Sequence, residues 1–427
     1  MKIMEKINLK DKICLVVDNG QFSYMAQHLA KSFKKVYYYK SYNAKGFPSP
    51  NEYYAGYGLD GVTHIHDIFE KSKDYDFDKI DLFCFFDLYY GFIQEHLVSL
   101  GKRVWGAKSA EEIELDRWSF KTKLKEFGLP VSTSKKIIGV DALVKYIKEH
   151  DNVWVKISRF RGLRETFKST NYETSKYIID EIRQKLGALQ KIFEFIVEDK
   201  IDAIFEHGYD GFNVWGQYPN KNIYGIEIKD CAYCCKVICY EDLPKDLKEV
   251  NKKFASYFKE KKYACEISTE NRYTKGKTSY FIDITSRRPE PPGAIYPLII
   301  DNLAEMYWYG GEGILVEPIF NAKYAVEIIM NSDDLGEGIA VSIEFPKKYE
   351  NNVSLRYGVK IDGVYSVLPQ GMTEVGQICA TGNTLKEAIE NVKIIAESVN
   401  GNIKINLDKL DSAVIEVEKT KIVGINF

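Results

Sequence analysis

The sequence has almost no net charge and no long apolar run. Its 427 residues carry 59 basic and 61 acidic side chains, for a formal net charge of −2. Proteins that bind nucleic acid non-specifically have a generally basic surface, which this charge balance does not predict. A nucleic-acid partner is therefore disfavoured and would need a local basic patch. The longest apolar run, Ile13 to Val17, is too short to span a bilayer, and the first twelve residues contain no secretory core. We therefore expect a cytoplasmic protein without membrane contact.

The chain also lacks the glycine-rich loop of dinucleotide-binding enzymes. After the first apolar run it reads Asp18-Asn-Gly-Gln-Phe-Ser, with no G-x-G-x-x-G pattern. Such a loop is needed to bring the backbone close to a pyrophosphate. A Rossmann dehydrogenase is therefore not indicated.

The sequence also lacks the paired Cys/His spacing that is typical of a zinc site. Four of the eight cysteines cluster between Cys231 and Cys239. Zinc is one interpretation, because thiolates suit that metal, but no second well-spaced Cys/His pair accompanies the cluster. Interleaved Tyr and Val residues favour the alternative, a β-strand in which cysteine acts as a small apolar residue.

The length of the chain predicts two to four structural units. Up to about residue 107, apolar runs alternate with helical stretches, which is typical of a parallel sheet in a Rossmann-like α/β domain. Ligands of such sheets bind at the carboxyl ends of the strands. Asn19, Gly20 and Gln21 lie at such an end, as candidates for substrate contact or as ordinary turn residues.

Strands and hairpins dominate from Val153 onward. Lys156 lies inside an apolar strand, and the apolar run 192–197 ends at the acidic pair Glu198-Asp199. In the last hundred residues, Thr384-Leu-Lys-Glu387 is a capping box that predicts a helix start. We expect this last part to form a separate small α+β unit.

The segment from Glu270 to Arg287 carries the clearest chemistry. Turn residues 274–277 join two strand-like runs, which would place Glu270 beside Asp283 in a hairpin. Asp283, Thr285 and Arg287 alternate and so share one side of an extended chain. Carboxylate and hydroxyl oxygens suit Mg²⁺, and a guanidinium suits phosphate. An exposed hairpin with a salt bridge is the alternative.

Asp283-Ile-Thr-Ser-Arg287 resembles the Glu-x-Asn-x-Arg motif of the ATP-grasp superfamily. Glu270 lies 13 residues before Asp283, close to the spacing of the first metal carboxylate in that family. The resemblance implies Mg²⁺, with Mn²⁺ as an alternative, bound by Glu270, Asp283 and Thr285, and ATP phosphate bound by Arg287. Asp for Glu and Thr for Asn are departures from the motif that would weaken or rearrange the metal clasp.

Further matches follow in the order of the family's motifs. Arg117 and Lys156 correspond to phosphate-binding residues of the family. Arg117 precedes a segment that ends in Gly-x-Pro. Glu198-Asp199 resembles the hinge whose backbone meets adenine, and Glu206 corresponds to the ribose-binding carboxylate. Together with Arg287, these residues form the ATP site that the resemblance implies.

The loop after Lys156 departs from the family pattern. It contains one glycine, Gly162, among arginines that include Arg159 and Arg161. These arginines would bind phosphate or an anionic substrate, or else form a solvated basic loop. Arg288 and Glu290, next to the metal motif, are further candidates for the substrate side.

The resemblance extends over nearly the whole chain. It implies an N-terminal pre-ATP-grasp α/β domain at 1–107, an ATP-grasp domain at 108–330 with a lid at about 118–197, and a small C-terminal domain at 331–427. The stretch from Val375 to Ala388 is similar to the last domain of the phosphoribosylamine–glycine ligase branch.

The function implied is an ATP- and magnesium-dependent ligase. It would activate a small-molecule carboxylate as an acylphosphate for attack by an amine, with Lys156 and Arg287 as the catalytic cations. An ATP-grasp kinase and a non-catalytic nucleotide-binding protein are the alternatives. The oligomeric state stays open between monomer and homodimer.

Overall fold

The computed structural model describes residues 7–41, 54–157, 166–229 and 231–427. By packing, the chain divides into two compact units, which are treated separately below. Unit 1 comprises Met1–Ala110, His207–Ser268 and Thr285–Phe427, and unit 2 comprises Glu111–Glu206 and Thr269–Ile284. The loop residues Arg159 and Arg161 lie outside the described residues.

Unit 1 begins with a five-stranded sheet in the order β3-β2-β1-β4-β5. All four strand pairings are parallel, which confirms the α/β pattern predicted for this region. The elements are β1 Ile13–Asp18, α1 Ser23–Ala30, β2 Lys35–Lys40, β3 Val62–Ile65, β4 Leu82–Phe85, α2 Gly91–Ser99 and β5 Arg103–Trp105. Asn19 follows β1 directly and therefore lies at the carboxyl end of the central strand.

A nine-stranded sheet follows the order β14-β13-β10-β11-β12-β15-β20-β17, with β21 also pairing β15. Its pairings β10–β11–β12–β15–β20–β17 are antiparallel. The strands are β10 Ala203–Val214, β11 Lys221–Ile228, β12 Ala232–Cys239, β13 Ala264–Thr274, β14 Ser279–Thr285, β15 Tyr324–Asn331, β17 Val353–Leu355, β20 Glu374–Gly382 and β21 Lys404–Ile405.

The cysteine-rich segment is strand β12, paired on both sides by β11 and β15. Cys231, Cys234 and Cys235 are buried, whereas Cys239 is exposed. Among the described residues, no group of three or more His, Cys, Asp or Glu side chains is arranged to hold a metal. The strand interpretation of this cluster is therefore confirmed.

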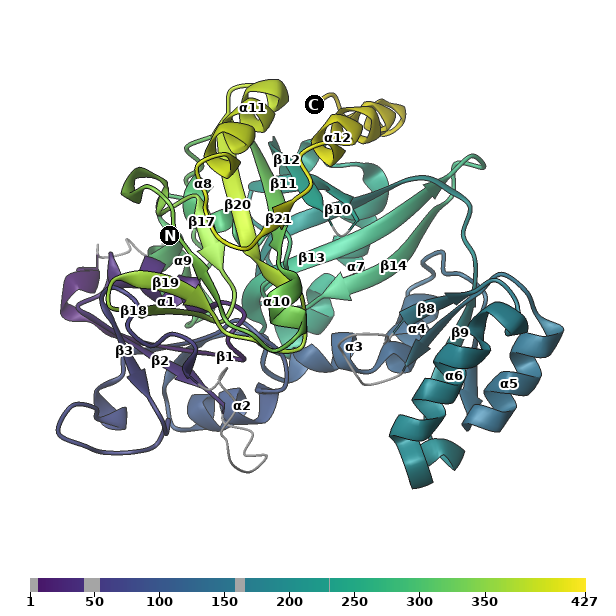
Figure 1. Cartoon of the computed structure of the whole chain (residues 1–427), viewed down its shortest axis with the longest axis horizontal. Coiled ribbons are helices and arrows are strands. Elements are labelled where there is room, and N and C mark those ends of the chain that lie inside the picture. Colours follow the sequence, from purple (N-terminus) through teal and green to yellow (C-terminus); the bar gives the residue numbers. More distant parts are fainter. Residues whose placement is uncertain (1–6, 42–53, 158–165, 230) are drawn as a thin grey trace. The chain divides into compact units, whose positions relative to one another are not determined.

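The remaining elements of unit 1 surround these sheets. Helix α11 packs on β15 and β20, and α12 packs on β11 and β12 (Figure 1). The predicted cap is present, because the Glu387 amide donates to Thr384 Oγ1 at 3.1 Å. These elements are α7 Lys245–Glu260, α8 Tyr296–Ile299, α9 Leu303–Gly310, α10 Asp333–Gly336, β16 Val341–Ile343, β18 Gly358–Ile361, β19 Val364–Val367, α11 Leu385–Ala396 and α12 Lys409–Lys419.

The predicted domain boundary at 330/331 falls within β15, which pairs with β20 from the last hundred residues. Packing places both strands in unit 1. The three-domain division remains a prediction about how the chain is organised.

Unit 2 contains a four-stranded sheet in the order β6-β9-β7-β8. Helices α5 and α6 lie side by side next to it (Figure 1), and a buried apolar cluster that includes Leu143, Phe195 and Ile179 joins them to the sheet. The elements are α3 Glu112–Leu115, α4 Arg117–Glu126, β6 Ser134–Ile138, α5 Val140–Glu149, β7 Val153–Ile157, β8 Thr166–Ser169, α6 Tyr172–Leu186 and β9 Glu194–Asp199.

One predicted helix is interrupted. The capping box at Ser109 predicts one continuous helix as far as Gly128, but α3 ends at Leu115 and α4 begins at Arg117. Asp116 leaves the helical region, with φ −101° and ψ 87°, and its carboxylate accepts from the Ser119 amide at 3.0 Å. An aspartate that caps a new helix start in this way ends the preceding one.

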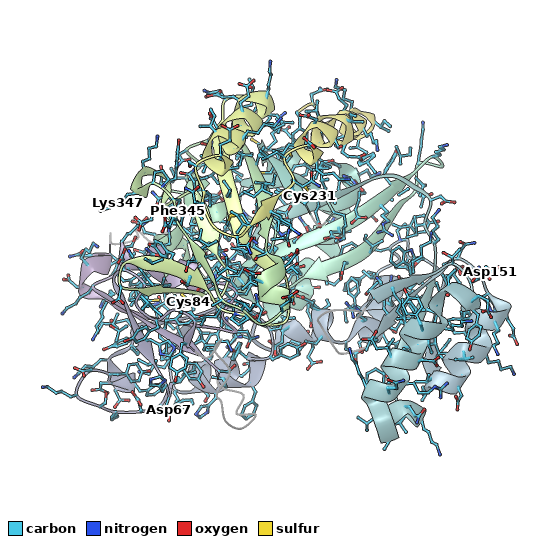
Figure 2. All side chains as sticks on the ribbon, in the orientation of Figure 1. Asp67, Cys84, Asp151, Cys231, Phe345 and Lys347 are labelled. Atoms are coloured by element: carbon cyan, nitrogen blue, oxygen red, sulfur yellow. The ribbon has the colours of Figure 1, made fainter. Side chains whose placement is uncertain are left out.

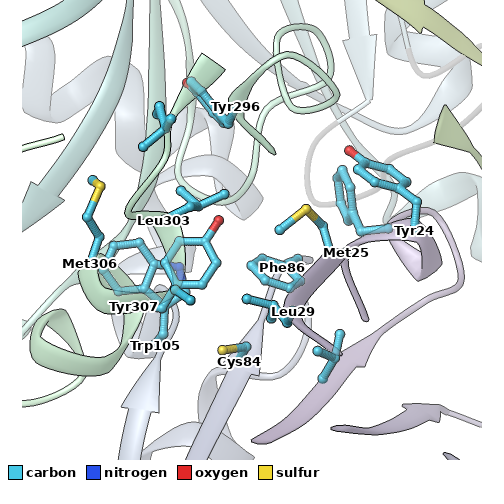
Figure 3. Close-up of a cluster of buried hydrophobic side chains, with 14 of the residues drawn as sticks. Tyr24, Met25, Leu29, Cys84, Phe86, Trp105, Tyr296, Leu303, Met306 and Tyr307 are labelled. Atoms are coloured by element: carbon cyan, nitrogen blue, oxygen red, sulfur yellow. The ribbon is translucent and has the colours of Figure 1, made fainter. Parts of the chain in front are cut away.

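The largest core lies in unit 1, where aromatic side chains from distant segments meet. Phe86, Trp105 and Tyr307 pack with Met25 and Tyr296 in this cluster (Figure 3). The rings of Trp105 and Tyr307 have centroids 4.7 Å apart. Separately, no described helix is both long and apolar enough to cross a membrane.

Candidate nucleotide site

Unit 2 contains a buried carboxylate held between two lysines. Glu198 Oε1 lies 3.1 Å from Lys121 Nζ, and Glu198 Oε2 lies 3.3 Å from Lys156 Nζ. Glu198 lies on β9 and Lys156 on the neighbouring strand β7, which fixes their separation across the sheet. Lys121 extends from α4. These three residues are called the Glu198 cluster below.

Charge and burial compete within the Glu198 cluster. Burial acts to raise the pKa of Glu198, but the two ammonium groups outweigh it and hold that pKa below its usual value. Burial lowers the pKa of Lys121, and the carboxylate of Glu198 opposes this change. With one carboxylate and two ammonium groups, the cluster has an excess positive charge suited to an anion.

Asp283 of the predicted metal motif contributes to the same electrostatic environment. Its carboxylate, on β14, acts to raise the pKa of Lys121. Phe120, which directly precedes Lys121 on α4, contacts the ring of Phe281, with centroids 5.4 Å apart. Asp283 therefore acts electrostatically on Lys121, one of the two lysines of the Glu198 cluster.

Buried and partly exposed residues alternate along the predicted metal motif, from Asp283 to Arg287. Asp283, Thr285 and Arg287 are partly exposed, whereas the intervening residues, Ile284 and Ser286, are buried. This agrees with the predicted alternation. Glu270 is also partly exposed, on β13, which is the strand next to β14.

The donor set of this motif fits magnesium. Glu270, Asp283 and Thr285 offer two carboxylates and a hydroxyl, all hard oxygen donors, and none of the three residues is buried. Mg²⁺ takes few protein ligands and completes its shell with phosphate oxygens and water. A site of this kind would not require three or more acidic, His or Cys ligands.

Arg117 begins α4 and is almost buried, at 7% exposure. Its Nη1 donates to the carbonyl of Ile157 on β7 at 2.7 Å, one residue beyond Lys156. The guanidinium thus lies beside strand β7, which carries Lys156.

Glu206, the predicted ribose carboxylate, is paired with a cation that sequence reasoning did not identify. Arg272 Nε donates to Glu206 Oε2 at 2.7 Å, and both side chains are about 29% exposed. The two residues lie on β10 and β13, which are neighbours in the sheet. A ribose hydroxyl would therefore bind to a carboxylate that Arg272 already holds in one orientation.

Asp199, which the sequence predicts to belong to an adenine-binding hinge, faces away from the Glu198 cluster. It is exposed and lines a cavity of about 370 Å³ in unit 2 together with Thr133, Ile201 and Tyr280. Its backbone amide donates to the carbonyl of Thr133 at 3.0 Å. Successive side chains alternate along a strand, so Glu198 and Asp199 point to opposite sides.

Asn19, Gly20 and Gln21, predicted to contact substrate, follow β1 in unit 1. Asn19 and Arg287 both contact Asp87 there. Asn19 Nδ2 donates to Asp87 Oδ2 at 2.9 Å, and Arg287 Nε lies 3.7 Å from Asp87 Oδ1. Gly20 has φ +103°, and its amide donates to Asp18 Oδ1 at 2.5 Å. Gln21 is partly exposed in the same turn. These residues form one polar surface at the end of β1.

Arg288 requires a correction. Its side chain is completely buried, and Nη1 donates to Glu266 Oε1 at 2.8 Å and to the Tyr307 hydroxyl at 2.9 Å. It also donates to the carbonyl of Gly293. A guanidinium already satisfied by the protein core does not fit a substrate contact, so we assign Arg288 to the core.

Glu290, which is partly exposed, pairs with the buried Glu327. Its Oε2 accepts from the Tyr24 hydroxyl at 3.1 Å. Burial raises the pKa of both Glu290 and Glu327, and each carboxyl acts on the other, while Arg356 opposes the change. This carboxyl pair holds a proton more tightly than two separate glutamates would.

Lys121, like Arg272, is a residue of this site that the sequence did not reveal. It sits between Phe120 and Leu124 on a helix rich in lysine, where a lysine is ordinarily solvated. The signal available was its place on the apolar face of α4, because a cation there needs a buried partner.

No protein-family model and no curated protein sequence matches this chain. Solved structures do match. A phosphoribosylamine–glycine ligase from Thermotoga maritima has a TM-score of 0.66 and 14% identity, with 91% of this chain and 97% of that chain covered. The biotin carboxylase domain dimer of 2-oxoglutarate carboxylase from Hydrogenobacter thermophilus, in complex with MgADP, ADP and bicarbonate, has a TM-score of 0.65 and 12% identity, with 97% and 99% covered.

A third match is the N5-carboxyaminoimidazole synthase from Aspergillus clavatus, in complex with ADP and 5-aminoimidazole ribonucleotide. It has a TM-score of 0.58 and 12% identity, with 91% of this chain and 99% of that chain covered. These three proteins are ATP-grasp enzymes, and this chain has their fold over nearly its whole length. The predicted fold resemblance and mixed α/β class are confirmed.

Proposed function

We propose that this chain is an ATP- and Mg²⁺-dependent ligase that activates a carboxylate as an acylphosphate for attack by an amine. The observation that carries the proposal is the Glu198 cluster beside Asp283. Two lysine ammonium groups hold the Glu198 carboxylate, and Asp283, whose carboxylate suits magnesium, acts electrostatically on one of them, Lys121, within the same unit. A shared fold does not by itself determine function, so the proposal rests on this site.

In this proposal the cations neutralise the phosphate charge. Lys156, Arg117 and Arg287 would bind ATP phosphates, and catalysis of phosphoryl transfer depends chiefly on such charge stabilisation. The backbone of Glu198-Asp199 would meet adenine, and Glu206 would accept hydrogen bonds from ribose. Arg159 and Arg161 remain proposed anion contacts.

Glu270, Asp283 and Thr285 would hold the magnesium ion, which when bound supplies charge neutralisation between the phosphates. A carboxylate oxygen of the substrate forms a bond to the γ-phosphorus, and the bond from that phosphorus to ADP breaks. The amine then attacks the acyl carbon, loses a proton and displaces phosphate. Lys156 and Arg287 stabilise the negative charge that develops on the phosphoryl oxygens.

The proposed substrate surface is the end of β1, with Asn19, Gly20 and Gln21 next to Asp87. Glu290 remains a proposed substrate-side residue, because Arg287 and Glu290 are only three positions apart in the chain. We further propose a cytoplasmic protein that acts on small molecules as a monomer or homodimer.

The test is a screen of carboxylate and amine pairs in the presence of ATP and magnesium. A ligase releases both ADP and phosphate, and forms an amide detectable by mass spectrometry, only when both substrates are present. ADP without phosphate, together with a phosphorylated product, would instead identify a kinase. A preceding measurement of the melting temperature with millimolar ATP and Mg²⁺ should show an increase, because ligands stabilise the state they bind. No increase would overturn the nucleotide assignment.

A further inference from the structure

The Glu198 cluster contains one more lysine than a single ion pair requires. Each oxygen of the Glu198 carboxylate has its own ammonium group, Lys121 on Oε1 and Lys156 on Oε2. The two lysines therefore do not compete for the same atom, and one of them can leave while the other stays.

The two lysines differ in burial. The Lys121 side chain is 3% exposed, whereas that of Lys156 is 17% exposed and that of Glu198 is 8% exposed. Lys121 reaches Glu198 from the buried face of α4, next to Phe120 and Leu124. Of the two, only Lys156 has a side chain with appreciable access to an arriving ligand.

We propose that Lys121 is a positioning residue that holds Glu198 permanently, so that the Lys156 ammonium is released to an ATP phosphate. This inference rests on the proposed function, because it assigns Lys156 to phosphate. Leaving a buried carboxylate without a partner is strongly unfavourable. With Lys121 in place, Glu198 stays compensated while Lys156 moves.

Without Lys121, the same carboxylate would retain Lys156. Glu198 would then have Lys156 as its remaining partner within the cluster, and any phosphate would compete with a buried carboxylate for that ammonium. ATP affinity should fall although every residue assigned to ATP contact is still present. Removing the charge of Glu198 as well should cancel the effect, since nothing would then retain Lys156.

The first measurement requires no nucleotide. The rate at which acetic anhydride acylates Lys156 is followed by peptide mass spectrometry in Lys121→Met, Lys121→Arg and Lys121→Met/Glu198→Gln. Acylation needs the neutral amine, so a tighter hold by Glu198 should slow it about tenfold in Lys121→Met. Lys121→Arg should resemble the wild type, and the double variant should recover or exceed the wild-type rate. An unchanged rate in Lys121→Met would overturn the proposal.

The second measurement is the dissociation constant for MgATP. We expect it to rise about tenfold in Lys121→Met and to stay near the wild-type value in Lys121→Arg. If wild-type protein binds no MgATP, the proposed function fails, while the acylation rates still decide whether Lys121 controls Lys156. Slowed acylation with unchanged MgATP affinity would overturn the role in nucleotide binding.

A folding control keeps the test decisive. Lys121→Met leaves Glu198 with fewer partners and could fail to fold, which circular dichroism would reveal. In that case Glu198→Gln is compared with Lys121→Met/Glu198→Gln. With residue 198 uncharged, Lys121 should no longer matter, so both variants should show equal Lys156 acylation and equal MgATP affinity. A difference between them would contradict the proposal.

Discussion

Arg288 and Glu266 form an ion pair at 2.8 Å in which neither side chain is exposed. Removing one partner of such a pair leaves an uncompensated buried charge. Arg288→Met should therefore lower the free energy of unfolding, measured by urea denaturation, by about 3–5 kcal/mol. The double variant Arg288→Met/Glu266→Gln should lose less than the sum of the two single variants.

The matched control for this pair is Lys404→Met, which breaks an exposed ion pair with Asp333. Exposed pairs contribute about 0–1 kcal/mol. A loss of similar size in Lys404→Met and Arg288→Met would show that burial of the core pair does not determine its contribution.

Asp283→Asn should strongly reduce magnesium-dependent ATP turnover while leaving the fold intact. Asp283 is partly exposed, so the substitution creates neither a cavity nor a buried charge. Loss of one charge-stabilising group typically lowers turnover by about 10²–10³-fold. ADP release and the melting temperature measure the two effects, with Asp301→Asn, on the exposed surface of unit 1, as the control. Unchanged ADP release would remove Asp283 from the metal site.

Glu206→Gln should reduce selectivity for ribose. The carboxylate, oriented by Arg272, would accept hydrogen bonds from ribose hydroxyls. A hydrogen bond to a charged group contributes about 1.5–3 kcal/mol, so the ratio of dissociation constants for 2′,3′-dideoxy-ATP and ATP should fall by at least about tenfold. Glu173→Gln, at an exposed helix position, is the control. If the ratio stays the same, Glu206 does not contact the ribose.

The stability of the protein should fall as pH rises through the weakly acidic range. Burial raises the pKa of Asp210 from 3.8 to about 7, against a hydrogen bond from the Tyr233 hydroxyl. A carboxyl with a raised pKa binds its proton more tightly in the folded state. Its contribution is therefore fully present below pH 3.8 and is lost as pH rises to about 7.

Asp210→Asn should reduce this pH dependence. Between pH 5 and pH 7 the wild type should lose about 2–3 kcal/mol more than the variant, at 1.36 kcal/mol per pKa unit. Asp18, whose pKa burial raises to about 6, contributes in the same direction and is unaffected by the substitution. Asp151→Asn is the control, since Asp151 is exposed at the edge of unit 2 (Figure 2). Parallel pH profiles for wild type and Asp210→Asn would contradict the assignment.

The burial of the cysteines predicts selective alkylation. Of the eight cysteines, all within the described residues, only Cys239 is exposed. Iodoacetamide should therefore add one group per native chain, at Cys239, as measured by mass spectrometry. A chelator should leave the melting temperature unchanged, because β12 is held by its strand pairings. A lower melting temperature with chelator would revive the zinc interpretation.

Local patterns predicted much of the secondary structure. Alternating strands and helices up to Trp105, the Thr384 cap and the strand nature of β12 all follow from periodicity and capping chemistry. The break at Asp116 was missed because two start signals, at Ser109 and at Asp116, lie within one apolar stretch. The sequence contains both signals, and which one ends a helix depends on packing.

The partners of charged side chains were much harder to predict. Arg288, which the sequence made a substrate-side candidate, lies just after β14 and is bound by Glu266 from β13, 22 positions away. Three strands, β6, β7 and β8, and two α-helices, α5 and α6, separate Lys121 from Glu198 in the sequence. A lysine or glutamate is equally common on a solvated surface, so only the three-dimensional structure shows that these two are paired.

The position of β20 has a consequence for folding during synthesis. β20 pairs with β15 along one edge and with β17 along the other, although it follows both in the chain. Until β20 has left the ribosome, the emerging chain must carry an open edge of buried, apolar β15 residues such as Val326 and Ile328. Unpaired apolar edges invite association with other chains. Premature termination between β15 and β20 should therefore give aggregating fragments rather than a smaller soluble protein.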